Sequence, residues 1–194
     1  MLPILRSKKD LTIAFNQQLP KYFHKHEIDA ILDTVKHKDK YALLINLLWQ
    51  TGARVSEILN LKVENIDFHG RTLRIITLKQ KNHPQRVLPV QGALLGQLGA
   101  YIALKQLQKK DHILNLTRQR AHQIITDAVL KAGFDKERAH PHTFRHSFAV
   151  FSVLSGVPIL VVKNWLGHSN IQSTLVYMQV LGSDTRSFYE GLQF

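Results

Sequence analysis

The chain has no cysteine, and Met and Trp occur only twice each among its 194 residues. Without cysteine, disulfide bonds, thiolate metal sites and a cysteine nucleophile are excluded. Acidic residues are also few: 14 Asp and Glu stand against 26 Lys and Arg, so the formal net charge is +12. An excess of this size favours a polyanionic partner, because each basic side chain that pairs with a phosphate releases counterions.

Long hydrophobic runs are absent as well. The most apolar stretch, YALLINLLW at residues 41–49, is interrupted by Asn46 and is shorter than the roughly 20 residues that span a bilayer. The first residues, MLPILRSKKDL, contain neither a long apolar core nor a small-residue cleavage site. The sequence thus predicts no contact with a membrane and a cytoplasmic location of the bacterial, nucleoid-associated kind.

Several motifs of phosphate chemistry are missing too: a glycine-rich loop ending in Gly-Lys-Ser/Thr, an HExxH motif and an acidic cluster suited to Mg²⁺. A phosphodiester can be cut without a metal if a nucleophile attacks phosphorus, fixed cations stabilise the oxygens and an acid protonates the leaving group. The candidates for these tasks are Arg54, Lys79 or Lys81, His142, Arg145, His168 and Tyr177. The prediction is a site that uses no metal and no cofactor.

The apolar residues that are present follow a helical period over most of the chain. At 44% of the sequence they suffice for one domain with a real core. A helical pattern starts near His26, residues 41–50 indicate a buried helix that stops at Gly52, and another helix covers residues 92 to about 108. Thr117 is a suitable N-cap for a further helix that ends before Gly133.

A different period separates these helices. Residues 71–78 and 87–90 are rich in β-branched side chains, the polar loop KQKNHPQR lies between them, and residues 62–68 are the expected first strand. The predicted fold class is therefore α+β, mainly α-helical with a small three-stranded antiparallel sheet. We expect an N-terminal arm or linker at residues 1–20, a catalytic domain at 21–182 and a C-terminal tail at 183–194.

The helix that begins after Thr117 has an apolar stripe and an opposite polar face. That polar face carries Arg118, His122, Gln123 and Thr126. A solvated surface would explain such a face, but the charge balance of the chain favours a surface that contacts nucleic acid.

Four blocks of the sequence resemble the tyrosine recombinase (phage integrase) family, in the order found there. They are TGARVSEILNL, a strand-loop lysine, HPHTFRHSFA and LGHSNIQSTLVY. In that family an Arg follows a TG turn, a Lys lies between the second and third strands, H-x-x-R opens a helix, and a Tyr follows the His of LGH by nine residues. His168 and Tyr177 have this spacing, and the match covers roughly residues 21–180.

The resemblance implies a site-specific DNA recombinase of the integrase, resolvase or invertase type. In that reaction Tyr177 attacks the scissile phosphate, forms a 3′-phosphotyrosyl link and releases a 5′-hydroxyl, without ATP or metal. The lysine protonates the leaving oxygen. The groups implied to hold the transition-state oxygens are Arg54, Arg145, His142 and His168.

Some assignments stay open at the level of the sequence. The "TLK" context favours Lys79 as the general acid, counting back from Pro89 favours Lys81, and we choose Lys79. The pair formed by His142 and His146 lacks a third metal ligand, so we interpret His142 as the base or a hydrogen-bond partner at the phosphate and His146 as structural. For Arg54 we expect an ion pair with Glu57, three residues further on, as well as contact with the phosphate.

The expected partners are double-stranded DNA and copies of this chain: a homo-tetramer on two DNA sites, with a monomer in the absence of DNA. The tail could fold back on its own domain or dock into a neighbouring protomer, and we favour exchange. We expect either an excised catalytic domain, whose core-binding domain is outside this sequence, or a short recombinase that resembles the fimbrial-switch type. Alternative functions are a type IB topoisomerase-like DNA relaxase and a catalytically silent DNA-binding regulator.

Overall fold

The structure, a computed structural model, describes residues 19–77 and 85–182. The N-terminal arm, the tail at 183–194 and both candidate lysines, Lys79 and Lys81, lie outside the described residues. The elements follow one another as α2 (Lys25–Asp33), α3 (Asp39–Thr51), α4 (Val55–Leu59), η1 (Val63–Asn65), β1 (Ile66–Asp67), β2 (Thr72–Ile76), β3 (Gln85–Pro89), α5 (Gly92–Lys105), α6 (Arg118–Lys131), η2 (Lys136–Arg138), α7 (Pro141–Leu154), α8 (Ile159–Leu166), α9 (Gln172–Leu175) and η3 (Val176–Leu181).

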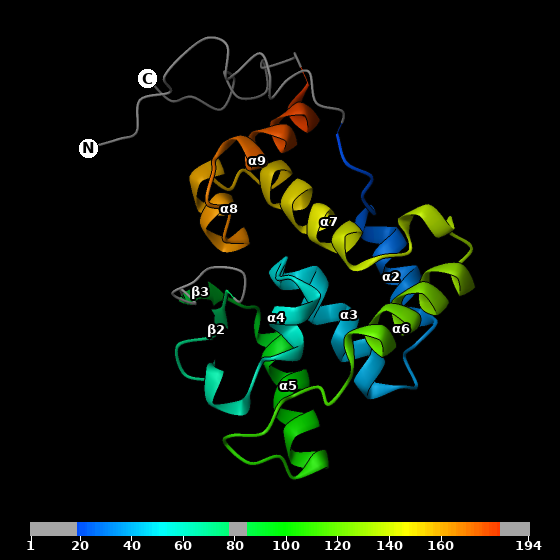
Figure 1. Ribbon diagram of the computed structural model, residues 1–194, viewed down its shortest axis with the longest axis vertical. Helices are drawn as coiled ribbons and strands as arrows, with labels where there is room; N and C mark the ends of the chain where they lie inside the picture. The colour runs from blue at the N-terminus through cyan, green and yellow to red at the C-terminus, as the bar shows by residue number, and fades with distance from the viewer. Residues whose placement is uncertain (1–18, 78–84, 183–194) are drawn as a thin grey trace.

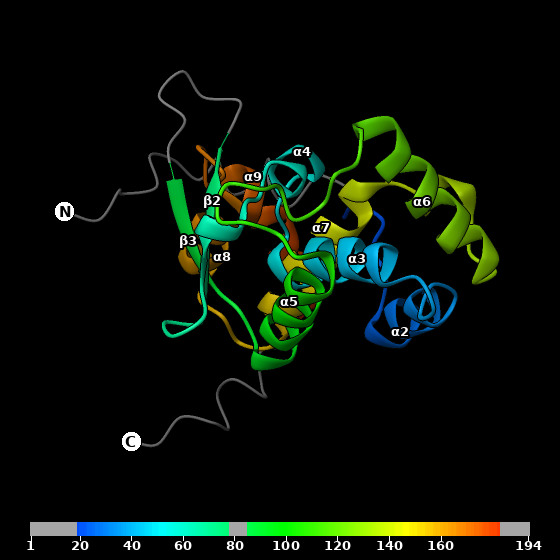
Figure 2. The same cartoon turned by 90° about the horizontal axis from the view of Figure 1, so that it is seen from below.

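Helix α3 is the centre of the larger hydrophobic core. Its sequence is apolar on most sides, and it packs against α2, α4, α5, α6 and α7 (Figure 2). The expectation of a buried helix here is confirmed. The helix ends where Gly52 adopts a left-handed conformation, with φ of 59°, which a glycine reaches without steric cost.

The sheet has the order β1-β2-β3, and both pairs are antiparallel. Leu73 faces Leu88 across the second pair, and both side chains are buried against the larger core. The first strand is much shorter than predicted, because residues 63–65 turn into a 3₁₀ helix. The side-chain oxygen of Asn65 accepts a hydrogen bond from the Lys62 backbone N–H at 2.9 Å, which stabilises that turn.

Helix α6 begins as the sequence predicts. The Thr117 hydroxyl oxygen accepts a hydrogen bond from the Arg120 backbone N–H at 3.1 Å, and the apolar stripe of the helix is buried. On the opposite face Arg118 and Gln123 are exposed. Thr126, however, donates its hydroxyl proton to the Ala139 carbonyl at 3.1 Å, so it supports the following loop.

A second, smaller core holds the C-terminal helices together (Figure 1). Helix α7 takes part in both cores: Phe144 near its start lies in the larger one, while Val150 and Val153 near its end lie in the smaller one. Helix α8 and the 3₁₀ helix η3 pack on α7, and the short helix α9 packs against α8 and η3. In the part of the chain that the structure describes, no helix combines the length and the apolar character needed to cross a bilayer.

Candidate active site

Arg54 lies between two helices, where α3 ends and α4 begins. Gly52 allows this tight turn, because a Cβ at that position would collide with the Phe148 ring. Arg54 is the N-cap residue of α4, and its backbone N–H donates to Glu57 Oε2 at 2.8 Å. Its guanidinium also donates to Glu57 Oε1 at 3.1 Å. The ion pair that the sequence predicts between Arg54 and Glu57 is therefore confirmed.

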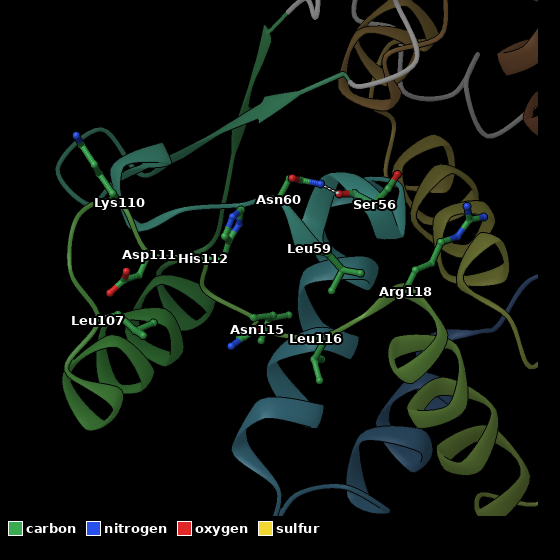
Figure 3. A pocket seen from close by; sticks show the side chains of 11 residues that line it. Ser56, Leu59, Asn60, Leu107, Lys110, Asp111, His112, Asn115, Leu116 and Arg118 are labelled. Atoms are coloured by element: carbon green, nitrogen blue, oxygen red, sulfur yellow. Dashed lines mark hydrogen bonds between the residues drawn. The ribbon is translucent and has the colours of Figure 1, made fainter.

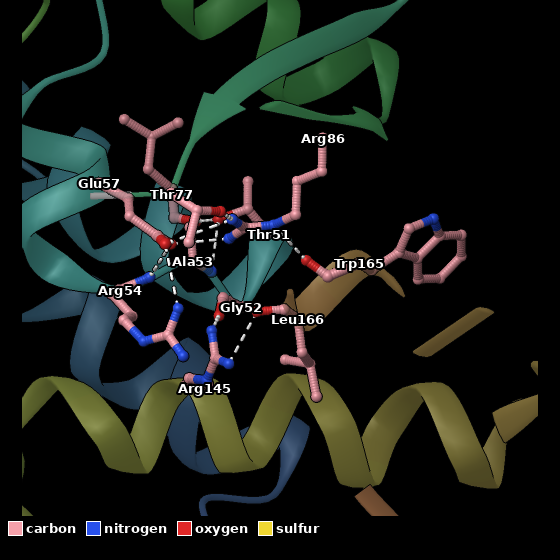
Figure 4. A network of polar contacts seen from close by, with 11 residues as sticks. Thr51, Gly52, Ala53, Arg54, Glu57, Thr77, Arg86, Arg145, Trp165 and Leu166 are labelled. Atoms are coloured by element: carbon pink, nitrogen blue, oxygen red, sulfur yellow. Dashed lines mark hydrogen bonds and ion pairs between the residues drawn. The ribbon is translucent and has the colours of Figure 1, made fainter. Parts of the chain in front are cut away.

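Glu57 is buried, with 3% of its surface exposed, and Arg86 is its second cationic partner. The Arg86 guanidinium lies 2.7 Å from Oε2 and 3.3 Å from Oε1 (Figure 4). Burial by itself would raise the pKa of the Glu57 carboxyl, but hydrogen bonds and charge from Arg86 and Arg54 outweigh it and the pKa is lowered. Glu57 is thus an ionised anchor for two guanidinium groups.

Arg86 was not among the predicted site residues, and its contacts connect the sheet to α8. Its Nε donates to the Trp165 carbonyl at 2.7 Å, and its Nη1 donates to the Thr77 hydroxyl at 2.9 Å. Because Arg86 is at the start of β3, these bonds tie that end of the β2–β3 pair to the last turn of α8. One sequence signal was available: Glu57 in an apolar helix face requires cationic partners.

Arg145 is buried in the first part of α7, with 4% of its surface exposed. Its Nη1 donates to the Gly52 carbonyl and its Nη2 donates to the Leu166 carbonyl, each at 2.8 Å. Burial and the neighbouring Arg54 lower the pKa of Arg145 to about 10, so it remains charged at neutral pH. Figure 4 shows its guanidinium between the end of α3 and the end of α8. We call Arg54, Glu57, Arg86 and Arg145 the cation cluster.

His168 follows Gly167, the left-handed residue that ends α8. Its Nδ1 lies 2.8 Å from the hydroxyl of Thr174, whose side chain is fully buried. Burial, reinforced by Arg145 and Arg54, lowers the pKa of His168 to about 3, so the ring is neutral. When the Thr174 hydroxyl donates to Nδ1, the ring proton is on Nε2, which then serves as a hydrogen-bond donor.

Tyr177 is in η3 and only 2% of its surface is exposed. Its hydroxyl lies 2.7 Å from Nδ1 of His146, a residue of α7 that we had interpreted as structural. Burial raises the pKa of the Tyr177 phenol to about 12, although the Arg145 charge opposes the shift. His146 and Tyr177 are 31 positions apart in the sequence, and their contact comes from the packing of η3 on α7. We call His146, His168 and Tyr177 the nucleophile cluster.

The structure gives less detail about the other predicted site residues, His142 and the candidate lysines. His142 is exposed in the first turn of α7, and its ring centroid is 6.4 Å from that of His146. The predicted lysine, Lys79, and its alternative, Lys81, lie outside the described residues. Within the described ranges no group of three or more His, Cys, Asp or Glu side chains is arranged to hold a metal ion.

The site as a whole carries excess positive charge. The cation cluster has three guanidinium groups and one carboxylate, which pairs with Arg54 and Arg86, and the two histidines of the nucleophile cluster are neutral. Buried, fixed guanidinium groups bind anionic oxygens strongly, since hydrogen bonds that involve a charged group are stronger than neutral ones. A buried phenol next to such a receptor is placed for nucleophilic attack on a phosphate.

A separate pocket of about 620 Å³ lies between α4 and the connection from α5 to α6 (Figure 3). Polar and basic side chains line it, among them Asn60, Lys110, His112 and Arg118. Neither the cation cluster nor the nucleophile cluster contributes to it. The pocket is therefore distinct from the site, although Arg118 links it to the exposed face of α6.

Comparison with known sequences relates the chain to a protein family. A sequence profile of the phage integrase family matches residues 21–183. A tyrosine recombinase of Pseudothermotoga lettingae is 31% identical over 172 residues, which cover 87% of this chain and 59% of the relative. Tyrosine recombinase XerD of Corynebacterium glutamicum is 31% identical over 195 residues, which cover 92% and 63%. The chain thus spans about three-fifths of the length of these relatives.

Solved structures agree on the fold. XerA recombinase superposes with a TM-score of 0.74 at 23% identity, over 92% of this chain and 68% of that one. The catalytic domain of bacteriophage HP1 integrase gives 0.68 at 23% identity, over 88% and 94%. The predicted fold class, mainly helical with a three-stranded antiparallel sheet, is confirmed, and the fold is that of tyrosine recombinase catalytic domains. Together with the profile over residues 21–183, these matches show that the chain belongs to the phage integrase family.

Proposed function

We propose that this chain is the catalytic part of a site-specific DNA recombinase, and that Tyr177 is its nucleophile. The main support for the proposal is the position of the buried Tyr177 hydroxyl beside the guanidinium groups of the cation cluster, which hydrogen bonds hold in place. The groups come from α4, α7, the end of α8 and η3, four separate elements. The phenol of Tyr177 is buried, and the buried Arg145 pairs with no carboxylate among the described residues; this suits chemistry on a bound phosphate better than it suits core packing.

In the proposed reaction the Tyr177 oxygen bonds to phosphorus while the bond from phosphorus to the 5′ oxygen breaks. Arg54, Arg145, His142 and His168 bind the non-bridging oxygens, where negative charge develops. Lys79 gives its proton to the leaving 5′ oxygen, with Lys81 as the alternative. The phosphotyrosyl link conserves the energy of the broken bond, so rejoining needs neither ATP nor metal.

Double-stranded DNA is the proposed partner. One similar structure is XerH recombinase bound to its difH substrate, with a TM-score of 0.75 at 20% identity over 90% of this chain and 54% of that one. The relatives and structures named above are recombinases or integrases. This favours recombination over the action of a type IB topoisomerase or of a silent regulator.

The proposed assembly is a homo-tetramer on two DNA sites, with the tail at residues 183–194 exchanged between neighbouring protomers. We also propose residues 21–182 as the catalytic domain and residues 1–20 as an arm or linker. The proposed location is the cytoplasm, in association with the nucleoid, where the DNA is found.

Substitution of the nucleophile tests the proposal. On a nicked suicide duplex the unmodified chain should form a covalent adduct that survives SDS, and Tyr177→Phe should form none while its DNA affinity stays nearly unchanged. Tyr101→Phe is the matched control, because Tyr101 is also a buried tyrosine but lies on α5, outside both clusters. An SDS-stable adduct with Tyr177→Phe would assign the nucleophile to another residue.

A further inference from the structure

We propose that His146 is an additional catalytic group: its Nδ1 holds the Tyr177 hydroxyl and accepts the phenol proton as the oxygen bonds to phosphorus. This inference rests on the proposed function, because it assigns a role within the same reaction. His146 and Tyr177 touch through a hydrogen bond of 2.7 Å. The attacking atom therefore has a direct contact with this imidazole.

The contact is built into the packing of the C-terminal helices. His146 is on α7 between Arg145, which is bound to two backbone carbonyls, and Ser147, whose hydroxyl donates to the Thr143 carbonyl at 2.8 Å. Tyr177 is on η3, which packs against α7, and belongs to the smaller core. The packing of η3 on α7 thus keeps a proton acceptor next to the nucleophile before DNA binds.

The direction of the hydrogen bond follows from the charge states of the two groups. Burial, with contributions from His142, Arg145 and His140, lowers the pKa of His146 to about 4, so its ring is neutral at pH 7. The Tyr177 phenol keeps its proton, because its pKa is raised to about 12. In the described part of the chain, Nδ1 is the hydrogen-bond partner of this hydroxyl. A buried phenol proton is satisfied only if it is donated, so Nδ1 accepts.

This arrangement prepares the phenol oxygen for attack. With its proton directed at His146, the oxygen keeps its lone pairs available for phosphorus. With the pKa of the phenol raised and that of the imidazole lowered, complete proton transfer before attack is strongly disfavoured. The proton therefore moves while the oxygen–phosphorus bond forms, since this bond makes the phenol much more acidic.

The proposed step balances. The bond from Tyr177 oxygen to phosphorus forms, the bond from phosphorus to the 5′ oxygen breaks, and the phenol proton moves to Nδ1, which makes His146 an imidazolium. The 5′ oxygen takes its proton from the lysine. In rejoining, the imidazolium returns its proton to the departing tyrosine oxygen, as microscopic reversibility requires.

Two substitutions separate proton acceptance from positioning. His146→Leu removes the acceptor, whereas His146→Asn retains an amide oxygen near the place of Nδ1 and accepts a hydrogen bond without taking up a proton. The measurement is the single-turnover rate of adduct formation on the suicide duplex between pH 6 and pH 9. Half-site affinity and melting temperature are measured alongside, to show that both variants fold.

We expect both variants to cleave about 10²- to 10⁴-fold more slowly, the range for loss of a general base, with His146→Asn the less impaired of the two. In the variants, solvent hydroxide must remove the phenol proton. For each unit of pH, the cleavage rate of the variants should therefore increase by a factor about ten times larger than the factor for the unmodified chain. The groups around His146, namely His140, His142, Arg145, His168 and Tyr177, are common to all three proteins, so the difference in slope reports on His146 alone.

Two outcomes would overturn the proposal. In one, His146→Leu cleaves within threefold of the unmodified chain. In the other, cleavage is slow but the pH dependence is unchanged, which reduces His146 to a packing contact. If His146→Leu fails to bind the half-site, the slope of His146→Asn decides. The proposed function has its own test: if Tyr177→Phe still forms an adduct, that function fails, whereas an unaffected His146 variant with a Tyr177-dependent adduct refutes this inference alone.

Discussion

The cation cluster and the nucleophile cluster lie in one site, but they differ in how many contacts hold each side chain. Glu57 accepts four hydrogen bonds, and Arg145 is bound to carbonyls at the ends of two helices. In contrast, the side chains of Tyr177 and His168 each have one described hydrogen bond. The anion receptor is thus fixed in advance, whereas the nucleophile depends on a few weak constraints and on the smaller core.

The difference makes chemical sense for a strand-exchange reaction. A receptor that reorganises during the reaction would lose most of its electrostatic stabilisation of the transition state. The nucleophile, however, must bond to phosphorus and be released again in each cycle. One hydrogen bond of about 1 kcal/mol net orients a phenol without preventing that movement. The predictions below test this contrast, from the largest expected effect to the smallest.

The strongest test removes the charge that holds the cation cluster together. Glu57→Gln leaves two guanidinium groups around a neutral amide in a buried place. Breaking a buried ion pair costs about 3–5 kcal/mol, so we expect the free energy of unfolding to fall by about that amount in urea titrations. Glu137→Gln is the control, because Glu137 pairs with Lys21 at the exposed surface and its loss should leave the unfolding curve unchanged.

A second test keeps the charge of the receptor and changes its shape. Arg145→Lys retains a cation but cannot bind the Gly52 and Leu166 carbonyls together with a phosphate. We expect adduct formation to slow by about 10²- to 10³-fold, the loss that follows removal of one oxyanion donor, while half-site binding persists. Arg74→Lys, an exposed position on β2, serves as the control. An equal rate for Arg145→Lys and the unmodified chain would mean that the guanidinium geometry is unimportant.

A third test loosens the nucleophile cluster. Thr174→Val removes the hydroxyl that contacts Nδ1 of His168 and leaves a partly buried nitrogen without its partner. We expect a loss of about 1–3 kcal/mol in stability and, because the ring is less well oriented, a cleavage rate roughly tenfold lower. If the rate falls as far as it does for Arg145→Lys, the contrast between the two clusters does not hold.

The smallest effect concerns pH. In the folded chain the pKa values of His146 and His168 are about 4 and about 3, below the ordinary value of 6.5. Between the folded pKa of each histidine and 6.5, the unfolded chain therefore binds more protons than the folded chain. Their contribution to stability is complete above pH 6.5 and is lost as the pH falls toward the folded values. At pH 5.5 we expect a loss of about 1 kcal/mol per histidine, measured as a drop in melting temperature. His146→Asn should show a shallower dependence, and an identical one would refute this assignment.

Local patterns in the sequence predicted much of the fold. The apolar stretch at residues 41–50 predicted α3, and Thr117 with the stripe that follows it predicted α6, because periodicity and capping depend on neighbouring residues alone. The strand expected at residues 62–68 was mostly wrong. The Asn65 side chain competes there for a backbone N–H and favours a 3₁₀ turn, which a count of β-branched residues does not register.

By itself, then, the sequence determined most of the helices, the second and third strands and the motif residues from Arg54 to Tyr177, since these follow from short spacings along the chain. Only the tertiary structure decided which groups touch. Arg86 meets Glu57 across 29 positions, Arg145 meets Gly52 across 93, and His146 meets Tyr177 across 31. Such pairs depend on how α3, α7, α8 and η3 pack against two separate cores. Packing of distant surfaces leaves no periodic trace in the sequence, because every contact joins residues whose spacing along the chain is arbitrary.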